Sequence, residues 1–326
     1  MKVRYSQADP VALSDEIGRR YDLKSPVSCQ LHRKGMSDVY KITAGDAVYY
    51  LKNYLSGVHS FADYEQEAHI INSLIETGVS AAAPVTLKDG GFVWQIDAPE
   101  GVRCTVMFAE AKEAPSGDGN KKSFALGRAL ANMHAVSDAQ DFKISRPPID
   151  FAQLIDEPIA KLRPHLQERN PDEYAFITAA MEDLRKYISE RLTTEKPYYG
   201  FCHGDVQYGN VCYNGDEPTF FDFDTMGYGW RVHDIAVHVF NVETFINPAF
   251  RESDEGKAFF DGYNSVRQLT QNEMACINAF AAIRAIWALG INIDLLRING
   301  FYSAVPLVDY LAGVFKTWHG KVIAGT

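Results

Sequence analysis

Residues 203–210 read HGDVQYGN, and residues 221–224 read FDFD. In these two stretches Asp205 is an acid that can lie beside a hydroxyl group, while Asn210 and Asp222 offer an amide oxygen and a carboxylate that can hold magnesium. Phosphoryl transfer needs both kinds of group, because one accepts or orients the proton of the nucleophile and the other holds metal at the phosphates. The two stretches therefore supply the parts of a phosphoryl-transfer site.

The residues around the two stretches predict a strand, a loop and a hairpin. Tyr198–Cys202 is a short apolar run that leads into the loop, and Asn210–Tyr213 and Thr219–Phe223 form two further strands. Residues 214–216 between them read NGD, which is a typical hairpin turn. Such a hairpin would bring the two candidate metal ligands near each other, with the acid on the loop before them.

The order HGD, four residues, Asn and then an apolar strand ending in DFD resembles the aminoglycoside phosphotransferase and choline kinase superfamily. This group also includes a homoserine kinase type and a bacterial stress-response kinase. The resemblance implies that Asp205 is the catalytic aspartate, that Asn210 and Asp222 bind Mg²⁺, and that ATP is the donor. It also implies an α+β, bilobal protein-kinase-like fold, with a small antiparallel-sheet N-lobe and a larger, mainly helical C-lobe.

Composition and length agree with a protein of two lobes. The chain has 326 residues, of which 46% are apolar and 23% charged, enough for two hydrophobic cores. We expect residues 1–110 to form a nucleotide-binding lobe, 111–120 a hinge, and 121–326 a lobe for catalysis and acceptor binding, because 111–120 is polar and rich in Gly and Pro.

Net charge, apolar runs and cysteine content limit which partners and which cellular compartment are expected for the protein. A net charge of −10 argues against a nucleic-acid partner, because phosphate backbones attract basic surfaces. We find no run of about 18 uninterrupted apolar residues and no apolar core of a signal peptide in residues 1–6, so no membrane partner is expected. Five scattered cysteines suit reduced thiols in the cytoplasm. The sequence leaves the oligomeric state open.

Hydrophobic periodicity and turn residues predict the elements of both lobes. In the first lobe we expect helices Val11–Tyr21 and Ser60–Glu76 and strands Val27–His32, Val39–Thr43, Ala47–Tyr54, Gly91–Ile96 and Val102–Phe108. In the second lobe we expect helices Phe151–Glu168, Asp172–Thr193, Trp230–Phe240, Ser253–Tyr263, Gln271–Ile298 and Tyr302–His319.

Lys52, at the end of an apolar strand, is the candidate for holding the α- and β-phosphates of ATP. A lone lysine on a strand is usually solvated, but kinase-like folds pair such a lysine with a glutamate of the next helix. Glu67 lies beside the apolar stripe of that helix and is the preferred partner, with Glu65 as the competitor. Both acids could also be surface residues of an amphipathic helix.

Two backbone segments of the first lobe are further candidates for the nucleotide site. The turn around Gly35 resembles the short phosphate loop of the superfamily, which would put Ser37 and Asp38 near ATP, although a plain hairpin turn remains open. The resemblance also implies that adenine hydrogen-bonds to backbone at the end of the last strand. The residues of that segment are Met107, Phe108, Ala109 and Glu110.

Three polar residues are expected to support the site. Asp234 resembles the superfamily's aspartate at the start of the helix after the metal-binding segment, and His203 precedes Asp205 by two residues, so both would brace the loop. Asp224 would tune a second metal or the orientation of Asp222. A zinc site built from Cys202, His203 and Cys212 is an alternative, but the sequence offers no fourth ligand at a sensible spacing.

The leading function is an ATP-dependent kinase acting on a hydroxyl group of a small molecule. A protein Ser/Thr kinase of the stress-response type and a non-catalytic nucleotide-binding regulator are the alternatives. Helices after residue 240 should build the acceptor pocket, and their aromatic and acidic residues would suit an amine-bearing alcohol. Choline, homoserine and an aminoglycoside or other antibiotic all remain open.

The segment between Asp222 and Asp234 predicts how the activity is controlled. It holds only eleven residues (234 − 222 − 1), with Thr225 and Tyr228 as its hydroxyls and no Ala-Pro-Glu at its end. Protein kinases place a longer activation loop here, and phosphorylation orders that loop. We therefore expect activity without phosphorylation of this segment.

Overall fold

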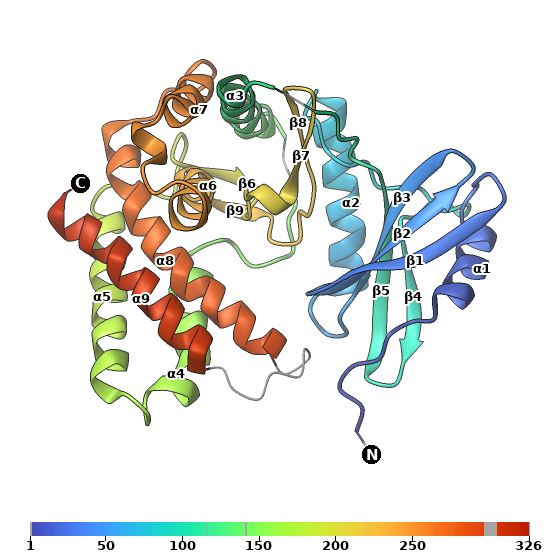
Figure 1. The fold of residues 1–326 in the computed structure, drawn as a ribbon, viewed down its shortest axis with the longest axis horizontal. Helices are drawn as coiled ribbons and strands as arrows, with labels where there is room; N and C mark the ends of the chain where they lie inside the picture. The colour runs from blue at the N-terminus through green and yellow to red at the C-terminus, as the bar shows by residue number, and fades with distance from the viewer. Residues whose placement is uncertain (1, 116, 141, 297–304, 326) are drawn as a thin grey trace. The chain divides into compact units, whose positions relative to one another are not determined.

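The structure, a computed structural model, divides the chain into two compact units. The first unit contains Met1–Lys112 and Thr219–Phe221, and the second contains Glu113–Pro218 and Asp222–Thr326. The chain thus leaves the first unit inside the polar stretch 111–120. Together the units have an α+β architecture, as the sequence predicts. The described residues are 2–115, 117–140, 142–296 and 305–325 (Figure 1).

The first unit is built on a five-stranded antiparallel sheet with the order β1-β2-β3-β5-β4 (Figure 1). The first three strands form a meander, and Gly45 in its second turn has a φ of 60°, which favours glycine. All five predicted strands are confirmed, with ends that shift by a few residues. The strands are β1 (Val27–Lys34), β2 (Ser37–Ala44), β3 (Ala47–Tyr54), β4 (Val93–Ala98) and β5 (Gly101–Ala109).

Two capped helices complete the first unit. Helix α1 (Pro10–Arg20) begins after Asp9, whose carboxylate accepts hydrogen bonds from the amides of its first turn. Helix α2 (Phe61–Glu76) begins with a reciprocal capping box between Ser60 and Asp63. Both starts agree with the helix boundaries that the sequence predicts.

The two helices cover opposite faces of the sheet (Figure 1). Ile17 of α1 belongs to the same buried cluster as Met107, whereas Tyr64 of α2 belongs to a cluster with Val106. Because neighbouring residues of a strand point to opposite faces, β5 contributes side chains to both clusters. The sheet is therefore buried on both sides, with Lys52 on its central strand.

The second unit is mainly helical and carries two short strand pairs, β6 with β9 and β7 with β8. Its elements are α3 (Gly119–Ser137), a π-helical turn (Ala152–Asp156), α4 (Glu157–Leu166), α5 (Pro171–Ser189), β6 (Tyr199–Cys202), a 3₁₀ turn (Tyr208–Asn210), β7 (Val211–Asn214), β8 (Glu217–Phe220), β9 (Gly227–Trp230), α6 (Arg231–Phe245), a second 3₁₀ turn (Phe250–Glu252), α7 (Asp254–Asn264), α8 (Gln271–Leu296) and α9 (Val305–Ala324). Strand β8 includes the residues at which the chain passes briefly into the first unit.

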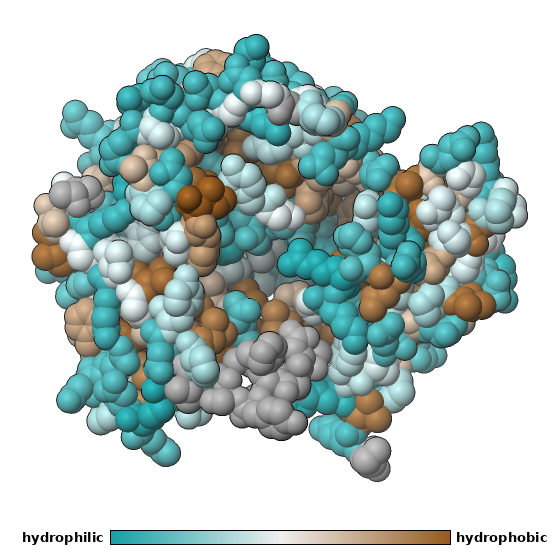
Figure 2. Space-filling view, viewed as in Figure 1, coloured by the Kyte–Doolittle hydropathy of each residue, from teal (hydrophilic) through white to brown (hydrophobic). Residues whose placement is uncertain are grey.

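Helix α8 forms much of the core of the second unit. Residues Gln271–Ile293 are long and apolar enough to cross a membrane, but 72% of their most apolar window is buried inside the structure. Such burial is what the core helix of a folded unit shows. The face drawn in Figure 2 is largely hydrophilic, with hydrophobic side chains in small separate groups. Most large apolar side chains are therefore used inside the two units.

The predicted helix Phe151–Glu168 is wrong in its first turns. Residues Ala152–Asp156 form a π-helical turn, in which the amide of Glu157 donates to the carbonyl oxygen of Ala152. Pro158 follows at once and has no amide hydrogen to continue a regular ladder. A local shift to i→i+5 hydrogen bonds is one way to accommodate that loss.

Strand β9 was not predicted, because two of the four residues of its sequence, GYGW, are glycines, which are depleted in strands. It pairs with β6, and Gly229 lies opposite Gly200. A Cβ at Gly229 would lie 2.8 Å from Cβ of Ile149, so this position requires glycine. The predicted end of α8 at Ile298 and the predicted start of α9 at Tyr302 lie outside the described residues.

Candidate active site

The two sequence motifs lie in contact within the second unit. Gly204 has a φ of 83°, and a Cβ at this position would lie 2.2 Å from the carbonyl oxygen of Thr225. The hydroxyl of Thr225 donates to the carbonyl oxygen of His203 at 3.4 Å. The rings of His203 and Phe223 pack with centroids 4.4 Å apart. The close approach of the two segments therefore requires the glycine of the HGD motif.

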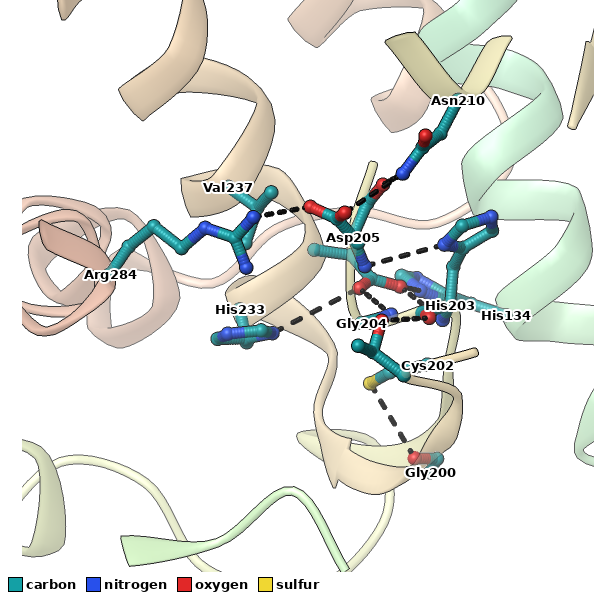
Figure 3. Close-up of polar contacts among 12 residues, drawn as sticks. His134, Gly200, Cys202, His203, Gly204, Asp205, Asn210, His233, Val237 and Arg284 are labelled. Carbon is teal, nitrogen blue, oxygen red and sulfur yellow. Dashed lines mark hydrogen bonds and ion pairs between the residues drawn. The ribbon is translucent and has the colours of Figure 1, made fainter. Parts of the chain in front are cut away.

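Asp205 is at the centre of a group of polar contacts (Figure 3). The amide nitrogen of Asn210 donates to the side-chain Oδ2 of Asp205 at 2.8 Å and to its backbone oxygen at 3.0 Å. Gln207 donates to the same Oδ2 at 2.8 Å. The backbone amide of Asp205 donates to Nδ1 of His203 at 3.3 Å. Two of the predicted site residues, Asp205 and Asn210, are thus brought into direct contact.

Arg284, which was not predicted from the sequence, forms an ion pair with Asp205. Its guanidinium donates through Nη2 to Oδ1 of Asp205 and lies 4.0 Å from the ring centroid of Trp287, one helical turn later. The residue is only 5% exposed. Arg284 is a single charge in the apolar run 279–289, and this isolation was the signal that could have identified it.

Asp234, at the start of α6, holds the loop by its backbone. Its Oδ2 accepts the amide hydrogen of His203 at 2.8 Å, and its Oδ1 accepts that of Gly204 at 2.7 Å. A third contact joins Oδ2 to Nε2 of His134 at 3.1 Å. All these groups are buried. The carboxylate therefore fixes the two residues that immediately precede Asp205.

The protonation states of Asp234 and His134 follow from burial and from their hydrogen-bond partners. Burial would raise the pKa of Asp234, but the hydrogen bond and charge of its histidine neighbours outweigh burial and lower it. Burial lowers the pKa of His134. An ionised Asp234 can only accept, so Nε2 of His134 carries the proton, and Nδ1 accepts from the hydroxyl of Tyr263 at 2.9 Å.

His134, Cys202 and Asp234 also place one potential metal-ligand atom each within 4.8 Å of one another. Burial raises the pKa of Cys202 well above its usual value, which favours the thiol over the thiolate that zinc binds. Its Sγ lies 3.7 Å from the carbonyl oxygen of Gly200, to which it donates. His134 and Asp234 are hydrogen-bonded to each other, whereas Cys202 donates to a backbone oxygen.

Asp222 has a backbone conformation that points to a special role. Its φ is 67°, and among the described residues it is the only residue other than glycine with a positive φ. Aspartate tolerates this left-handed region better than most residues, but the conformation still has a cost and is commonest at functional sites. Asp222 directly precedes Phe223, whose ring packs on His203.

The oxygen atoms of Asn210 and Asp222 suit a magnesium ion. Because Nδ2 of Asn210 donates to Asp205, Oδ1 of Asn210 is the amide atom that can bind metal. Carboxylate and amide oxygens are the hard ligands that Mg²⁺ prefers. Two residues after Asp222, the backbone oxygen of Asp224 accepts a hydrogen bond from Arg146 at 3.0 Å. This contact anchors the backbone that follows Asp222.

In the first unit, the structure separates the two candidate glutamates. Oε1 of Glu65 accepts the amide hydrogens of Phe92 and Val93 at 2.9 and 2.8 Å, so its carboxylate serves the start of β4. Glu67 is 2% exposed and Lys52 is 7% exposed, which excludes the solvated interpretation for both. Glu67, and not Glu65, is thus the buried acid of α2.

Ser37 and Asp38, which were expected in the turn around Gly35, lie in a strand. Ser37 and Asp38 begin β2, so the turn contains only Gly35 and Met36. Asp38 is 1% exposed, forms an ion pair with Arg103 at 2.9 Å and accepts from the hydroxyl of Tyr5 at 2.7 Å. Its carboxylate is therefore an internal structural group and is not available to a phosphate.

The predicted adenine segment already uses two of its amides. The amide of Ala109 donates to the carbonyl oxygen of Ala83 at 2.8 Å, and that of Glu110 donates to Val48 at 3.3 Å. The carbonyl oxygen of Met107 accepts from Val85 at 2.8 Å. The amides of Ala109 and Glu110 are therefore already used, and a hydrogen bond donated to adenine must come from another backbone amide of this segment.

Comparison with known proteins gives consistent similarities. A family model described as the phosphotransferase enzyme family matches residues 28–269. An uncharacterized protein of Synechocystis sp. is 31% identical over 303 residues, which is 91% of this chain and 81% of that protein. Amicoumacin kinase of Bacillus subtilis is 28% identical over 275 residues, or 80% of this chain and 78% of that enzyme.

The fold is also similar to that of solved structures. The structure of amicoumacin kinase hAmiN in complex with AMP-PNP, Ca²⁺ and Ami matches with a TM-score of 0.76 at 22% identity. The match covers 98% of this chain and 94% of that chain. The similarity extends over both units, and it agrees with the kinase-like fold that the motifs predict.

Proposed function

The chain belongs to the phosphotransferase enzyme family, and we propose that it uses Asp205 to direct the γ-phosphoryl group of ATP to a hydroxyl group of a small molecule. Enzymes of this family are kinases with alcohol acceptors, and ATP with a divalent metal is their cofactor.

The contact between Asp205 and Asn210 is the observation that carries the proposal. The acid is held at Oδ2 by Asn210, while Asp234 fixes the loop backbone just before it. A carboxylate held in this way can accept a hydrogen bond from the acceptor hydroxyl and take its proton as the new bond to phosphorus forms. Asp205 is 15% exposed at its side chain, so an acceptor can reach it.

Asn210 and Asp222 are the proposed magnesium ligands, since both offer oxygen atoms. A bound Mg²⁺ neutralises charge on the phosphates during transfer. His203, Asp224 and Asp234 support this arrangement through the backbone and ring contacts of the two motifs. Intact acids at all the central positions argue against a regulator that has lost catalysis.

Residues 1–110 are proposed as the nucleotide-binding lobe, 111–120 as a hinge, and 121–326 as the lobe for catalysis and acceptor binding. Lys52 and Glu67 would form the phosphate-binding pair, because a buried ammonium and a buried carboxylate in one unit are each costly unless paired. The backbone of Ser37 and of residues 107–110 would complete the nucleotide site. We place the enzyme in the cytoplasm, where ATP is available and its thiols stay reduced.

The test is steady-state release of ADP in the presence of acceptor sets that contain amino alcohols, hydroxy acids, aminoglycosides and a Ser/Thr protein substrate. Asp205→Asn should keep the fold and ATP binding but lower kcat by about 10²–10⁴-fold. Asp254→Asn is the matched control, because the side chain of Asp254 is 84% exposed on α7. Near-normal kcat in Asp205→Asn would overturn the assignment.

A further inference from the structure

Arg284 brings a buried positive charge to the proposed site of catalysis. Its Nη2 donates to Oδ1 of Asp205 (Figure 3). The guanidinium carbon lies 4.0 Å from the ring centroid of Trp287, and this stacking fixes the plane of the guanidinium. Among the described residues, its Nη1 is buried and has no hydrogen-bond partner. A buried guanidinium nitrogen without an acceptor is unfavourable, which points to a partner that comes from outside the chain.

His233 adds a second buried polar group beside Arg284. It lies on α6, is 2% exposed, and neither of its ring nitrogens has a hydrogen-bond partner among the described residues. Figure 3 draws its ring on the same side of the loop as Arg284, with Nδ1 4.0 Å from Oδ1 of Asp234. Burial lowers the pKa of His233 to about 4, and Arg284 contributes to this shift, so the ring is neutral at pH 7 and can donate one hydrogen bond.

The unpaired donors at this point favour an acceptor with one negative charge. The ion pair of Asp205 and Arg284 is neutral as a unit, and His233, whose Nδ1 lies 4.0 Å from Oδ1 of the ionised Asp234, adds one donor without charge. A cationic group placed beside Arg284 would meet repulsion in a site with little water to screen it. A phosphate group, with about two negative charges, would lack a second cation in this cluster. A carboxylate matches the one unpaired guanidinium donor.

We propose that Arg284 binds a carboxylate group of the acceptor through Nη1, so that the alcohol phosphorylated by this enzyme is a hydroxycarboxylic acid. The inference rests on the proposed function and adds the class of acceptor and its anchoring residue. His233 donates a second hydrogen bond to the same carboxylate. This acceptor differs from the amine-bearing alcohol that the aromatic and acidic residues after position 240 suggested.

The acceptor O–H bond breaks and its proton passes to Asp205, while the hydroxyl oxygen forms a bond to the γ-phosphorus of ATP. The bond from that phosphorus to the bridging oxygen breaks, and ADP leaves with the electron pair. The carboxylate held by Arg284 does not react. Arg284 is therefore a positioning residue that fixes the hydroxyl beside Asp205.

The test uses matched acceptors that differ only in the charged group. Homoserine is compared with homoserinol, and 4-hydroxybutyrate with 1,4-butanediol, in an assay of ADP release by the full-length enzyme. In each pair we expect kcat/KM for the acid to exceed that for the alcohol by about 100-fold or more, because loss of the carboxylate leaves buried donors unpaired. Glycerol 3-phosphate serves as the dianionic probe and should be a poor acceptor.

Variants of Arg284 show whether this residue causes the preference for acids over alcohols. Arg284→Gln should reduce the acid-to-alcohol ratio of kcat/KM to within about tenfold of one, mainly through the KM of the acid, and Arg284→Lys should recover part of it. Arg128→Gln, which removes a half-exposed arginine of the same unit, should leave the ratio unchanged. If the substitution instead disturbed Asp205, kcat/KM would fall equally for the acid and the alcohol, and the ratio of the two values would not change.

The outcomes separate the two proposals. Equal use of acids and alcohols, preference for cationic or phosphorylated acceptors, or an unchanged ratio in a folded Arg284→Gln overturns the role of Arg284 and leaves the kinase function standing. Absence of transfer to every acceptor overturns the proposed function and this inference together. The comparison of acceptors with the unaltered enzyme does not depend on the folding of any variant.

Discussion

The carboxylate of Asp234 accepts the backbone amide hydrogen of His203 at 2.8 Å, although 31 residues separate the two in the chain. The other oxygen of the carboxylate accepts the amide hydrogen of Gly204, so both oxygens of Asp234 hold the loop before Asp205. The position of Asp205, the proposed catalytic acid, therefore depends on a residue at the start of α6 that makes no direct contact with it among the described contacts. Such indirect support is common for functional loops.

Asp234→Asn should lower the free energy of unfolding by about 2–4 kcal/mol, because an amide has one oxygen and cannot accept both backbone hydrogens and the hydrogen of His134. Urea denaturation measures this change. Asp254→Asn, on the surface, should change the value by less than about 0.5 kcal/mol. Equal stability of the two variants would contradict the bracing role.

Stability should fall as the pH drops from 7.5 to 5.5. Burial lowers the pKa of both His233 and His238 from 6.5 to about 4, so both stay neutral in the folded protein. In the unfolded chain they bind protons below about pH 6.5, which favours unfolding. The stabilisation is present above the unfolded pKa and is lost toward pH 4, at about 1.4 kcal/mol per histidine by pH 5.5.

The check is urea denaturation at a series of pH values, with His238→Gln as the second sample. Glutamine cannot gain a proton, so this variant should lose about half of the pH-dependent change contributed by the two histidines. The absolute stability of the variant does not matter, because only the slope against pH is compared. An identical slope would show that His238 does not titrate in this range.

Asp222→Ala should weaken Mg²⁺-dependent binding of ATP by at least about tenfold, measured by calorimetry, because it removes the proposed carboxylate ligand. Affinity for ATP without magnesium is the internal control and should change little. Asp222→Asn distinguishes ligand loss from backbone strain, since asparagine tolerates the left-handed conformation at φ 67°. If the asparagine variant binds Mg·ATP normally, the carboxylate is not the ligand.

The enzyme should be active without phosphorylation between Asp222 and Asp234. Thr225 donates to His203, and the hydroxyl of Tyr228 donates to the carbonyl oxygen of Phe142 at 2.9 Å, so both hydroxyls already serve the fold. The measurement is the rate of ADP release by protein that has been dephosphorylated and verified by mass. Activity that emerges only after phosphate is added to Thr225 or Tyr228 would refute this.

The sequence predicted the parts of the fold and site that local patterns encode. The HGD and DFD motifs, the hairpin turn at 214–216 and the Ser60 cap are each written in a few neighbouring residues. The burial of Glu67 also followed from its place beside an apolar stripe, while its pairing with Lys52 stays a prediction. These features do not require knowledge of how distant segments meet.

Contacts between distant segments were not predictable in the same way. Arg284 meets Asp205 across 79 residues, and the apolar pattern of α8 does not reveal which segment its one charged residue faces. Asp38 was assigned to a phosphate loop because nothing local indicates that Arg103, 65 residues later, will pair with it. Strand β9 was missed because its glycines serve close packing against neighbours rather than strand propensity.

The first unit is not one continuous piece of chain, and this has a consequence for its synthesis. The amide of Phe220 donates to the carbonyl oxygen of Ser80, and the amide of Ala82 donates to that of Phe220, both at 2.9 Å. Residues 219–221 emerge from the ribosome 107 positions after Lys112 (219 − 112). At about 5–20 residues per second, the first unit waits roughly 5–20 s for its last segment. A nascent chain stopped at residue 112 would therefore expose the edge at 80–82 to other strands and chaperones.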